Sequence, residues 1–91
     1  MKYEIISTGR FKKDLKTVLK RGYDPKLIAS VVEIIASGEP LPEKYKDHSL
    51  SGNWINHREC HITPDWLLVY KIDSDILVLT LTRTGTHSDL F

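Results

Sequence analysis

Five side chains in this 91-residue chain combine acid–base and anion-binding ability. They are His48, His61, Asp65, Arg83 and His87. Histidine exchanges its proton near neutral pH, an ionised aspartate can act as a base, and arginine stabilises negative charge that grows on a phosphate. Such a set is suited to general acid–base catalysis at a group that becomes more negative during the reaction.

Cleavage of RNA is one reaction that needs this set and no metal ion. A base removes the proton of a ribose 2′-OH, which attacks the adjacent phosphorus, and an acid protonates the departing 5′ oxygen. A cation stabilises the added charge of the five-coordinate phosphorane. Trp66 and Phe91 are candidates for stacking on a base. The last nine residues, RTGTHSDLF, also differ from the small polar residues usual at chain ends.

Each polar candidate also has a structural interpretation. His61 fits a structural histidine at a strand end about as well as a catalytic one. Asp65 follows a proline and can simply shape a turn. Arg83 can pair with a surface carboxylate, and His48 can be a solvated loop residue. The sequence leaves these alternatives open.

The aromatic residues and the cysteine have simpler explanations. Trp54 and Trp66 are typical of core or rim aromatics, and Phe91 can fold back onto the core. Cys60 is most simply a small buried hydrophobic residue. His57 and His61 would need a helix to share a metal ion, because on a strand they lie about 13 Å apart. We therefore predict no metal site.

Hydrophobic patterning predicts the elements that position these residues. Residues 3–6 are β-prone and predict a first strand. Apolar residues at helical spacing predict one helix that ends at Gly22 and a second that begins after Asp24 and ends before Gly38. Residues 39–53 contain two prolines and scattered charge, which predict a surface loop.

Three further strands are predicted at about residues 54–61, 66–72 and 76–83. The connections ITPD and DSD are short enough for antiparallel hairpins. We therefore expect one α+β domain over residues 1–91, with a strand, two helices and an antiparallel three-strand meander, and with the helices on one face of the sheet.

The hairpins also predict which residues are neighbours. The first turn would place His61 beside Trp66. A second turn centred on Ser74 would place Arg83 beside Asp65 or Trp66. Strands lie about 4.8 Å apart, so His61 and Arg83 would flank the middle strand at about 10 Å. A slip of one residue would turn either side chain to the other face.

Charge is unevenly distributed along the chain, whose net charge is +1. Residues 8–26 carry seven basic and two acidic groups, a net of +5, whereas residues 27–91 carry five basic and nine acidic groups, a net of −4. A basic patch of this kind attracts polyanions, or it is the solvated face of a helix. On the first interpretation Lys12, Lys13 and Lys16 contact RNA.

Composition narrows the class of protein further. The chain is 41% hydrophobic and 27% charged, as expected for a globular protein that needs no cofactor to fold. A single cysteine favours a reducing compartment. The chain contains no signal-peptide pattern and no run of about 20 apolar residues that could span a membrane. We expect a cytoplasmic protein without a membrane partner.

Three segments together resemble the YafQ branch of the RelE/ParE superfamily, the ribosome-dependent mRNA interferase toxins. They are FKKDLK near the start, YKDHSLSGNWINHRECHITPDWLLVYKI in the middle and LTRTGTHSDLF at the end. The specific features are DH in the loop, H-x-x-x-D-W across the hairpin and R-T-G-T-H-x-x-x-F at the end. The resemblance covers essentially the whole chain. Ser49 stands where proline is expected in close relatives, which affects loop stiffness rather than chemistry.

This resemblance implies a toxin of a type II toxin–antitoxin system that cleaves messenger RNA in the A site of a translating ribosome without a metal. Its partners would be a cognate antitoxin, the ribosome with its ribosomal RNA, and the message. The functional positions of the family fall on His48, His61, Asp65, Trp66, His87 and Phe91, with Arg83 as the phosphate-binding cation. Our hypothesis makes His87 the acid and either Asp65 or His61 the base.

Two alternatives with the same fold belong to other functional classes. ParE-type toxins inhibit DNA gyrase by binding it and need no histidine cluster, so the histidines and the terminal phenylalanine argue against that function. A non-catalytic RNA- or protein-binding module is the other alternative. Assays for message cleavage and for gyrase inhibition separate the three.

Overall fold

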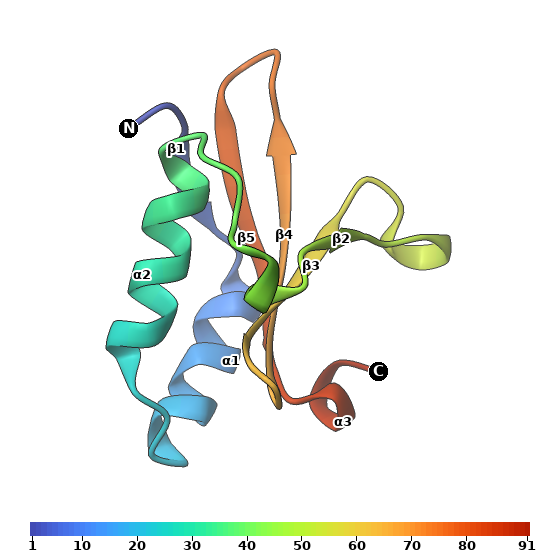
Figure 1. Ribbon diagram of the computed structural model, residues 1–91. Helices are drawn as coiled ribbons and strands as arrows, with labels where there is room; N and C mark the ends of the chain where they lie inside the picture. Colours follow the sequence, from blue (N-terminus) through green and yellow to red (C-terminus); the bar gives the residue numbers. More distant parts are fainter.

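Two helices cover one face of a five-stranded sheet in the computed structural model, which describes residues 1–91 (Figure 1). The elements in chain order are β1 (Glu4–Ser7), α1 (Gly9–Lys20), α2 (Pro25–Ala36), η1 (Glu43–Tyr45), β2 (His48–Ser49), η2 (Gly52–Trp54), β3 (Arg58–Thr63), β4 (Trp66–Asp73), β5 (Val78–Gly85) and α3 (His87–Leu90). None of the helices has the length and hydrophobicity needed to cross a membrane.

The strand order in the sheet is β1-β5-β4-β3-β2. β3, β4 and β5 form the predicted antiparallel meander, and β1 joins its edge parallel to β5. This confirms the predicted α+β fold. The short elements η1, β2, η2 and α3 were not predicted. Of these, the two-residue strand β2 lies within the expected loop and extends the sheet beyond β3.

Local capping explains where the helices begin and end. The Asp24 side chain accepts a hydrogen bond from the backbone N–H of Lys26 at 2.9 Å, and Thr8 caps α1 in the same way. Gly22 and Gly38 follow α1 and α2 with φ of 94° and 85°, a conformation that glycine adopts without strain. Both helix ends agree with the sequence prediction.

The core lies between the two long helices and the inner face of the sheet. It contains Tyr3, Phe11, Val18, Ile28, Val31, Ile35, Ala36, Cys60, Ile62, Trp66, Leu68, Tyr70, Leu79 and Leu81. Burial raises the pKa of the Cys60 thiol to about 12, so this side chain is a neutral core group, as predicted. Leu67 and Val69 alternate with the core residues of β4. They are buried on the opposite face of the sheet, the outer face, which α1 and α2 do not cover.

Two predicted strands begin later than expected because the backbone turns there. β3 starts at Arg58 rather than at 54, since η2 is a 3₁₀ turn and Asn56 has a φ of 70°. β5 starts at Val78 rather than at 76, because Leu77, with a φ of 55°, belongs to the turn. An extended strand cannot pass through these left-handed residues.

The register of the first hairpin differs by one residue from the prediction. His61 lies opposite Leu67, and a register shift follows, so that Thr63 rather than His61 pairs with Trp66. The extra residue in β3 is an irregularity of the kind that a β-bulge produces. Sequence patterning carries no direct signal for it.

The second hairpin departs further from the prediction. Arg83 lies opposite Val69, not beside Asp65 or Trp66. The turn at residues 74–77 is longer than a turn centred on Ser74, and a second register shift leaves Thr82 without a partner between Val69 and Tyr70. Because of both changes, Arg83 pairs with a residue in the middle of β4 rather than with the start of that strand.

Candidate active site

Two histidines and a glutamate meet on the face of the sheet that α1 and α2 leave uncovered. His48 on β2 lies opposite Glu59 on β3, and His61 follows two residues later on the same face. Glu59 Oε1 lies 3.4 Å from His48 Nε2 and 3.9 Å from His61 Nε2. One carboxylate thus stands between two imidazole rings.

Glu59 is the site residue that the sequence prediction missed. Its side chain is only 9% exposed, which is unusual for glutamate unless it has a partner. The signal was present in the alternation of β3, RECHIT. A period of two puts Glu59 and His61 on one face and the buried Cys60 and Ile62 on the other.

The two imidazole rings are held differently. His48 Nδ1 lies 2.8 Å from the carbonyl oxygen of Lys46, which can only accept, and its Nε2 faces a carboxylate. Both contacts of His48 are satisfied when the ring carries two protons. His61 Nδ1 lies 3.4 Å from the Pro64 carbonyl oxygen and its Nε2 is farther from Glu59. The His61 ring is therefore held by longer contacts than the His48 ring.

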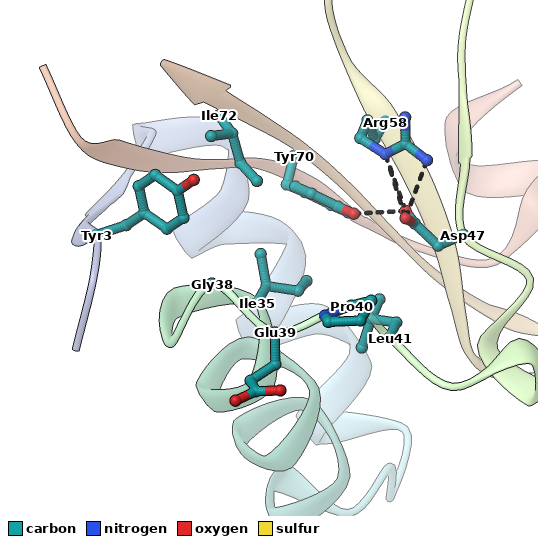
Figure 2. A pocket seen from close by; sticks show the side chains of 10 residues that line it. All are labelled: Tyr3, Ile35, Gly38, Glu39, Pro40, Leu41, Asp47, Arg58, Tyr70 and Ile72. Atoms are coloured by element: carbon teal, nitrogen blue, oxygen red, sulfur yellow. Dashed lines mark hydrogen bonds and ion pairs between the residues drawn. The ribbon is translucent and has the colours of Figure 1, made fainter. Parts of the chain in front are cut away.

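A polar network anchors the loop that presents His48. Asp47 accepts hydrogen bonds from Arg58 Nε at 3.2 Å, from Arg58 Nη2 at 3.0 Å and from the Tyr70 hydroxyl. Figure 2 shows these groups converging on one carboxylate at the side of a cavity of about 240 Å³. Burial and the bond to Asp47 raise the pKa of Tyr70, so its hydroxyl stays a donor. The network fixes Asp47 and therefore the next residue, His48.

Removal of Asp47 is expected to destabilise the protein more than removal of one of its partners. Asp47→Ala leaves Arg58 without its counter-ion and should lower the free energy of unfolding by about 2–4 kcal/mol, whereas Tyr70→Phe removes one hydrogen bond and should lower it by about 1 kcal/mol. Urea denaturation measures both. Glu39→Ala, at the rim of the same cavity, is the matched control. Equal losses for Asp47→Ala and Glu39→Ala would contradict this role of Asp47.

The C-terminal tail begins on the same rung of the sheet as His61. Gly85 pairs with Leu67, which in turn pairs with His61, so His61 and Gly85 backbones lie about 10 Å apart. α3 follows directly, and in Figure 1 it lies on the side of the sheet away from α1 and α2. A Cβ on Gly85 would lie 2.9 Å from the Asp89 Cβ, so only glycine allows α3 to fold back here.

Asp89 fixes the short helix in place. Thr86 Oγ1 accepts from the Asp89 N–H, and Asp89 Oδ2 accepts from the Thr86 N–H at 2.8 Å, which is a capping box. The same carboxylate pairs with Arg21 Nη1 at 2.7 Å. The Arg21 guanidinium, together with the Thr86 N–H, holds the pKa of Asp89 well below its usual range.

An aromatic contact joins this tail to the loop before β3. The Phe91 ring centre lies 5.3 Å from that of His87 and 6.3 Å from that of Trp54, which itself contacts His57 at 5.5 Å. His87 is exposed, and Phe91 is 52% exposed. The tail thus presents a titratable ring and an open aromatic face at the rim of the outer face.

Loss of the Asp89 carboxylate is expected to release the tail. In Asp89→Ala at pH 7, the chemical shifts of the Phe91 ring protons should move to random-coil values, because the ring no longer lies next to the Trp54 and His87 rings. A depressed pKa stabilises docking fully above the unfolded value of about 3.9. In the native protein the signals should therefore change only as the pH falls below about 4. Asp75→Ala, in an exposed turn, is the control; unchanged Phe91 signals in Asp89→Ala would contradict the anchoring role.

Arg83 is engaged with α1 rather than with the histidines. Its Nε lies 2.6 Å and its Nη2 3.2 Å from the two carboxylate oxygens of Asp14, with side-chain exposures of only 14% and 13%. The Thr84 N–H also donates to Asp14. None of the four cavities contains His61, Arg83 and His87 together. Carboxylate pairing, the alternative left open for Arg83, matches its position.

Trp66 likewise occupies its alternative position, in the core. It is 0% exposed, its Nε1 donates to Thr84 Oγ1 at 2.8 Å, and its ring meets Tyr23 edge-on at 5.0 Å. A ring with no open face cannot stack on an RNA base in this conformation. Phe91 and Trp54 are the aromatic residues that remain near the surface of the site.

The comparisons with known proteins decide the family. The chain matches, over residues 3–91, the family described as the bacterial toxin of type II toxin–antitoxin system, YafQ. This protein belongs to the YafQ toxin family. The mRNA interferase toxin YafQ of Escherichia coli K12 is 38% identical over 89 residues, which are 97% of this chain and 95% of that protein.

Solved structures agree over the whole length. A metal-bound toxin from Helicobacter pylori has a TM-score of 0.92 at 47% identity and covers 98% of this chain and 99% of its own. The E. coli DinJ–YafQ toxin–antitoxin complex contains a chain with a TM-score of 0.89 at 37% identity, which covers 100% of this chain and 99% of its own. The fold is therefore that of YafQ toxins.

The remaining predicted residues lie at the β3–β4 turn and on α1. Asp65 accepts hydrogen bonds from the Thr63 hydroxyl at 2.9 Å and from the Tyr23 hydroxyl at 3.1 Å. These two donors lower its pKa. Asp65 therefore joins the β3–β4 turn to the segment between α1 and α2.

The predicted RNA-contacting lysines, Lys12, Lys13 and Lys16, are exposed on α1, on the helix-covered side of the sheet.

Proposed function

We propose that this protein is a toxin that cleaves messenger RNA in the A site of a translating ribosome and does so without a metal ion. Membership of the YafQ family supports the role of toxin, and the E. coli relative is named an mRNA interferase. That activity cuts within an RNA chain, so the protein is an endoribonuclease. It acts where translation occurs, in the cytoplasm.

The observation that carries this proposal is the histidine cluster on the uncovered face of the sheet. Glu59 lies between His48 and His61. Leu67 pairs with His61 on one side and with Gly85 on the other, and the tail that carries His87 begins directly after Gly85. Such a cluster serves proton transfer on opposite sides of a reacting phosphate. A gyrase inhibitor that acts by binding alone has no need of it.

The contacts of each ring suggest its role. His61, held loosely by Glu59 and Pro64, accepts the proton of the 2′-OH. His87, exposed on α3, protonates the departing 5′ oxygen. His48, whose two nitrogens face a carbonyl and a carboxylate, is the cation of the cluster and stabilises the phosphorane. Phe91 offers its open face to a base.

Asp65 is not the base in this mechanism. A base must accept a proton during the reaction, and the donors on Asp65 stabilise its ionised form. Its hydroxyl partners also occupy the carboxylate, with Thr63 on one oxygen and Tyr23 on the other. We therefore choose His61 between the two candidates and give Asp65 the task of holding the hairpin turn beside it.

The low net charge of the chain supports dependence on the ribosome. The whole chain carries a net charge of only +1, and free RNA is held mainly by multiple phosphate contacts with lysine and arginine. A protein with so few such contacts needs its substrate to be presented. The exposed Lys12, Lys13 and Lys16 contact ribosomal RNA, on the side of the sheet opposite the histidines.

A cognate antitoxin neutralises the toxin. The E. coli family member forms a toxin–antitoxin complex with DinJ, and its fold matches this chain over the full length. Purification of this protein together with the product of a neighbouring antitoxin gene, and loss of cleavage on mixing the two, would test this partner directly.

Primer extension on a translated message tests the proposed function. Cut sites should appear when translating ribosomes and toxin are both present and should be absent when either is left out. A message with a single 2′-deoxy substitution before the cut should resist cleavage at that position, because the attacking hydroxyl is missing. Equal cutting without ribosomes, or cutting of the deoxy message, would overturn the mechanism. Gyrase inhibition without cleavage would favour the ParE-type alternative.

A further inference from the structure

All four arginines of the chain are already paired with carboxylates. The pairs are Arg10–Asp14 at 3.9 Å, Arg21–Asp89 at 2.7 Å, Arg58–Asp47 at 3.0 Å and Arg83–Asp14 at 2.6 Å. In the last three pairs the guanidinium donates hydrogen bonds to the carboxylate rather than to a ligand. Arg10 is exposed, but it lies on α1, on the helix-covered side of the sheet. Apart from His48, a cation that binds substrate phosphate near the histidines must therefore come from lysine.

A cavity beside His61 supplies two such lysines. It has a volume of about 190 Å³ and is lined by Lys44, Lys46, His61, Thr63 and Pro64. None of these residues is acidic, and neither lysine takes part in an ion pair. The lining contains two lysines and no carboxylate, so an anion in this cavity would meet no group of like charge.

The two lysines are held by the same backbone that positions His48. Lys44 lies on η1 with its Nζ 5.0 Å from the centre of the Tyr45 ring, a cation–π contact. Lys46 ends η1 in a left-handed conformation, with a φ of 50°. Its carbonyl oxygen is the partner of His48 Nδ1. A shift of this turn would move both the cations and the His48 ring.

We propose that this cavity, the Lys44–Lys46 pocket, binds an RNA backbone phosphate next to the link that is cut. This inference rests on the proposed function. An ammonium group binds phosphate as a point charge, and two lysines that line one cavity with His61, whose side chain is 27% exposed, match a singly charged phosphodiester. The two lysines thus have the phosphate-binding role that was predicted for Arg83, because a phosphate in this pocket lies next to His61, the proposed base.

Single-turnover cleavage on programmed ribosomes, with toxin in excess, tests the pocket. The double variant Lys44→Ala/Lys46→Ala should lower the rate by at least about tenfold, as loss of charge-assisted hydrogen bonds would. Lys44→Arg/Lys46→Arg should keep most of the rate, because it keeps both charges. Lys20→Ala/Lys26→Ala removes two exposed lysines from the helix side and is the matched control.

The salt dependence gives a second readout that a purely structural role would not change. Each phosphate contact contributes to the fall of affinity with salt. The slope of log half-saturating toxin concentration against log salt should therefore decrease by about 1 to 2 in the double alanine variant. A double variant with the rate and salt slope of the control would overturn the proposal.

The phosphate can belong to the message or to ribosomal RNA, and a modified message separates these sources. Neutral methylphosphonate replaces the phosphate on one side of the cut. If the pocket binds the message, the native toxin loses rate on this message and the double alanine variant loses little more. If it binds ribosomal RNA, the double alanine variant loses the same factor on both messages.

Failure of this inference is distinguishable from failure of the proposed function. If the native toxin cuts no message on ribosomes, the proposed function is wrong. If the native toxin cuts and the double alanine variant cuts equally well, the proposed function stands and the Lys44–Lys46 pocket is not a phosphate site. Circular dichroism and the urea midpoint of each variant show whether it is folded.

Discussion

Replacement of His61 or His87 by alanine is expected to lower the single-turnover rate of message cleavage on programmed ribosomes by about 10²–10⁴-fold, the range typical of general acid–base groups. His61 lies beside Glu59 on β3, and His87 begins α3, which follows the Gly85 that pairs with Leu67. Each ring acts on a different oxygen of the same phosphate, so neither can replace the other.

The rate of the double variant should also be higher than the product of the two single losses would give. When acid and base act in one concerted step, removal of either leaves the other with little to contribute. The double variant His61→Ala/His87→Ala should therefore be only slightly slower than the slower of the single variants. Multiplied losses would indicate that the two rings act in separate steps.

His57 provides the matched control for these variants. It lies in the same part of the molecule, and its ring contacts Trp54 rather than Glu59. His57→Ala should cut at nearly the native rate. Losses below about tenfold for both His61→Ala and His87→Ala would contradict their assignment as base and acid. Equal half-saturating toxin concentrations for all variants would confirm that the change lies in chemistry rather than in docking.

Local signals in the sequence were enough to predict most of the fold. Asp24 before Pro25, and glycines after each helix, fix the helix ends through groups a few residues away. Three β-prone runs separated by short turn segments identified the strands of the meander. These features depend on neighbours in the chain, and a single sequence displays them.

What could not be predicted depends on pairings that sequence spacing does not reveal. The longer turn before Val78 and the register shift between β4 and β5 displaced Arg83 by several residues along β4. Asp14, its partner, lies 69 residues away in the sequence. No local pattern distinguishes an arginine that will meet a carboxylate on a distant helix from one that will meet a phosphate.

Part of the site was predictable and was overlooked. The histidines and the terminal phenylalanine stood out because their types suit the chemistry. Glu59 did not, because glutamate on a strand is usually solvated, and only the pairing of β2 with β3 brings His48 opposite to it. β2 is two residues long, and a strand that short leaves no hydrophobic pattern.

The Arg83–Asp14 pair leads to a prediction that separates a structural from a chemical role. Both side chains are largely buried, so Arg83→Ala should leave Asp14 without its counter-ion and lower the free energy of unfolding by about 3 kcal/mol. Arg10 pairs with the same carboxylate at 3.9 Å but is 67% exposed. Arg10→Ala should therefore change stability by less than about 1 kcal/mol. Urea denaturation of the two variants measures this contrast on a single carboxylate.

Cleavage by the folded fraction then decides the role of Arg83. If the pair is structural, Asp14→Ala and Arg83→Ala should both be destabilised, and both should cut at similar rates when assayed well below their urea midpoints. If Arg83 instead binds the phosphate, Asp14→Ala frees it and should keep the native rate, whereas Arg83→Ala should lose about a hundredfold or more. The structure favours the first result, because both nitrogens that Arg83 directs at Asp14 are within 3.2 Å of its oxygens and the Thr84 N–H holds that carboxylate in place.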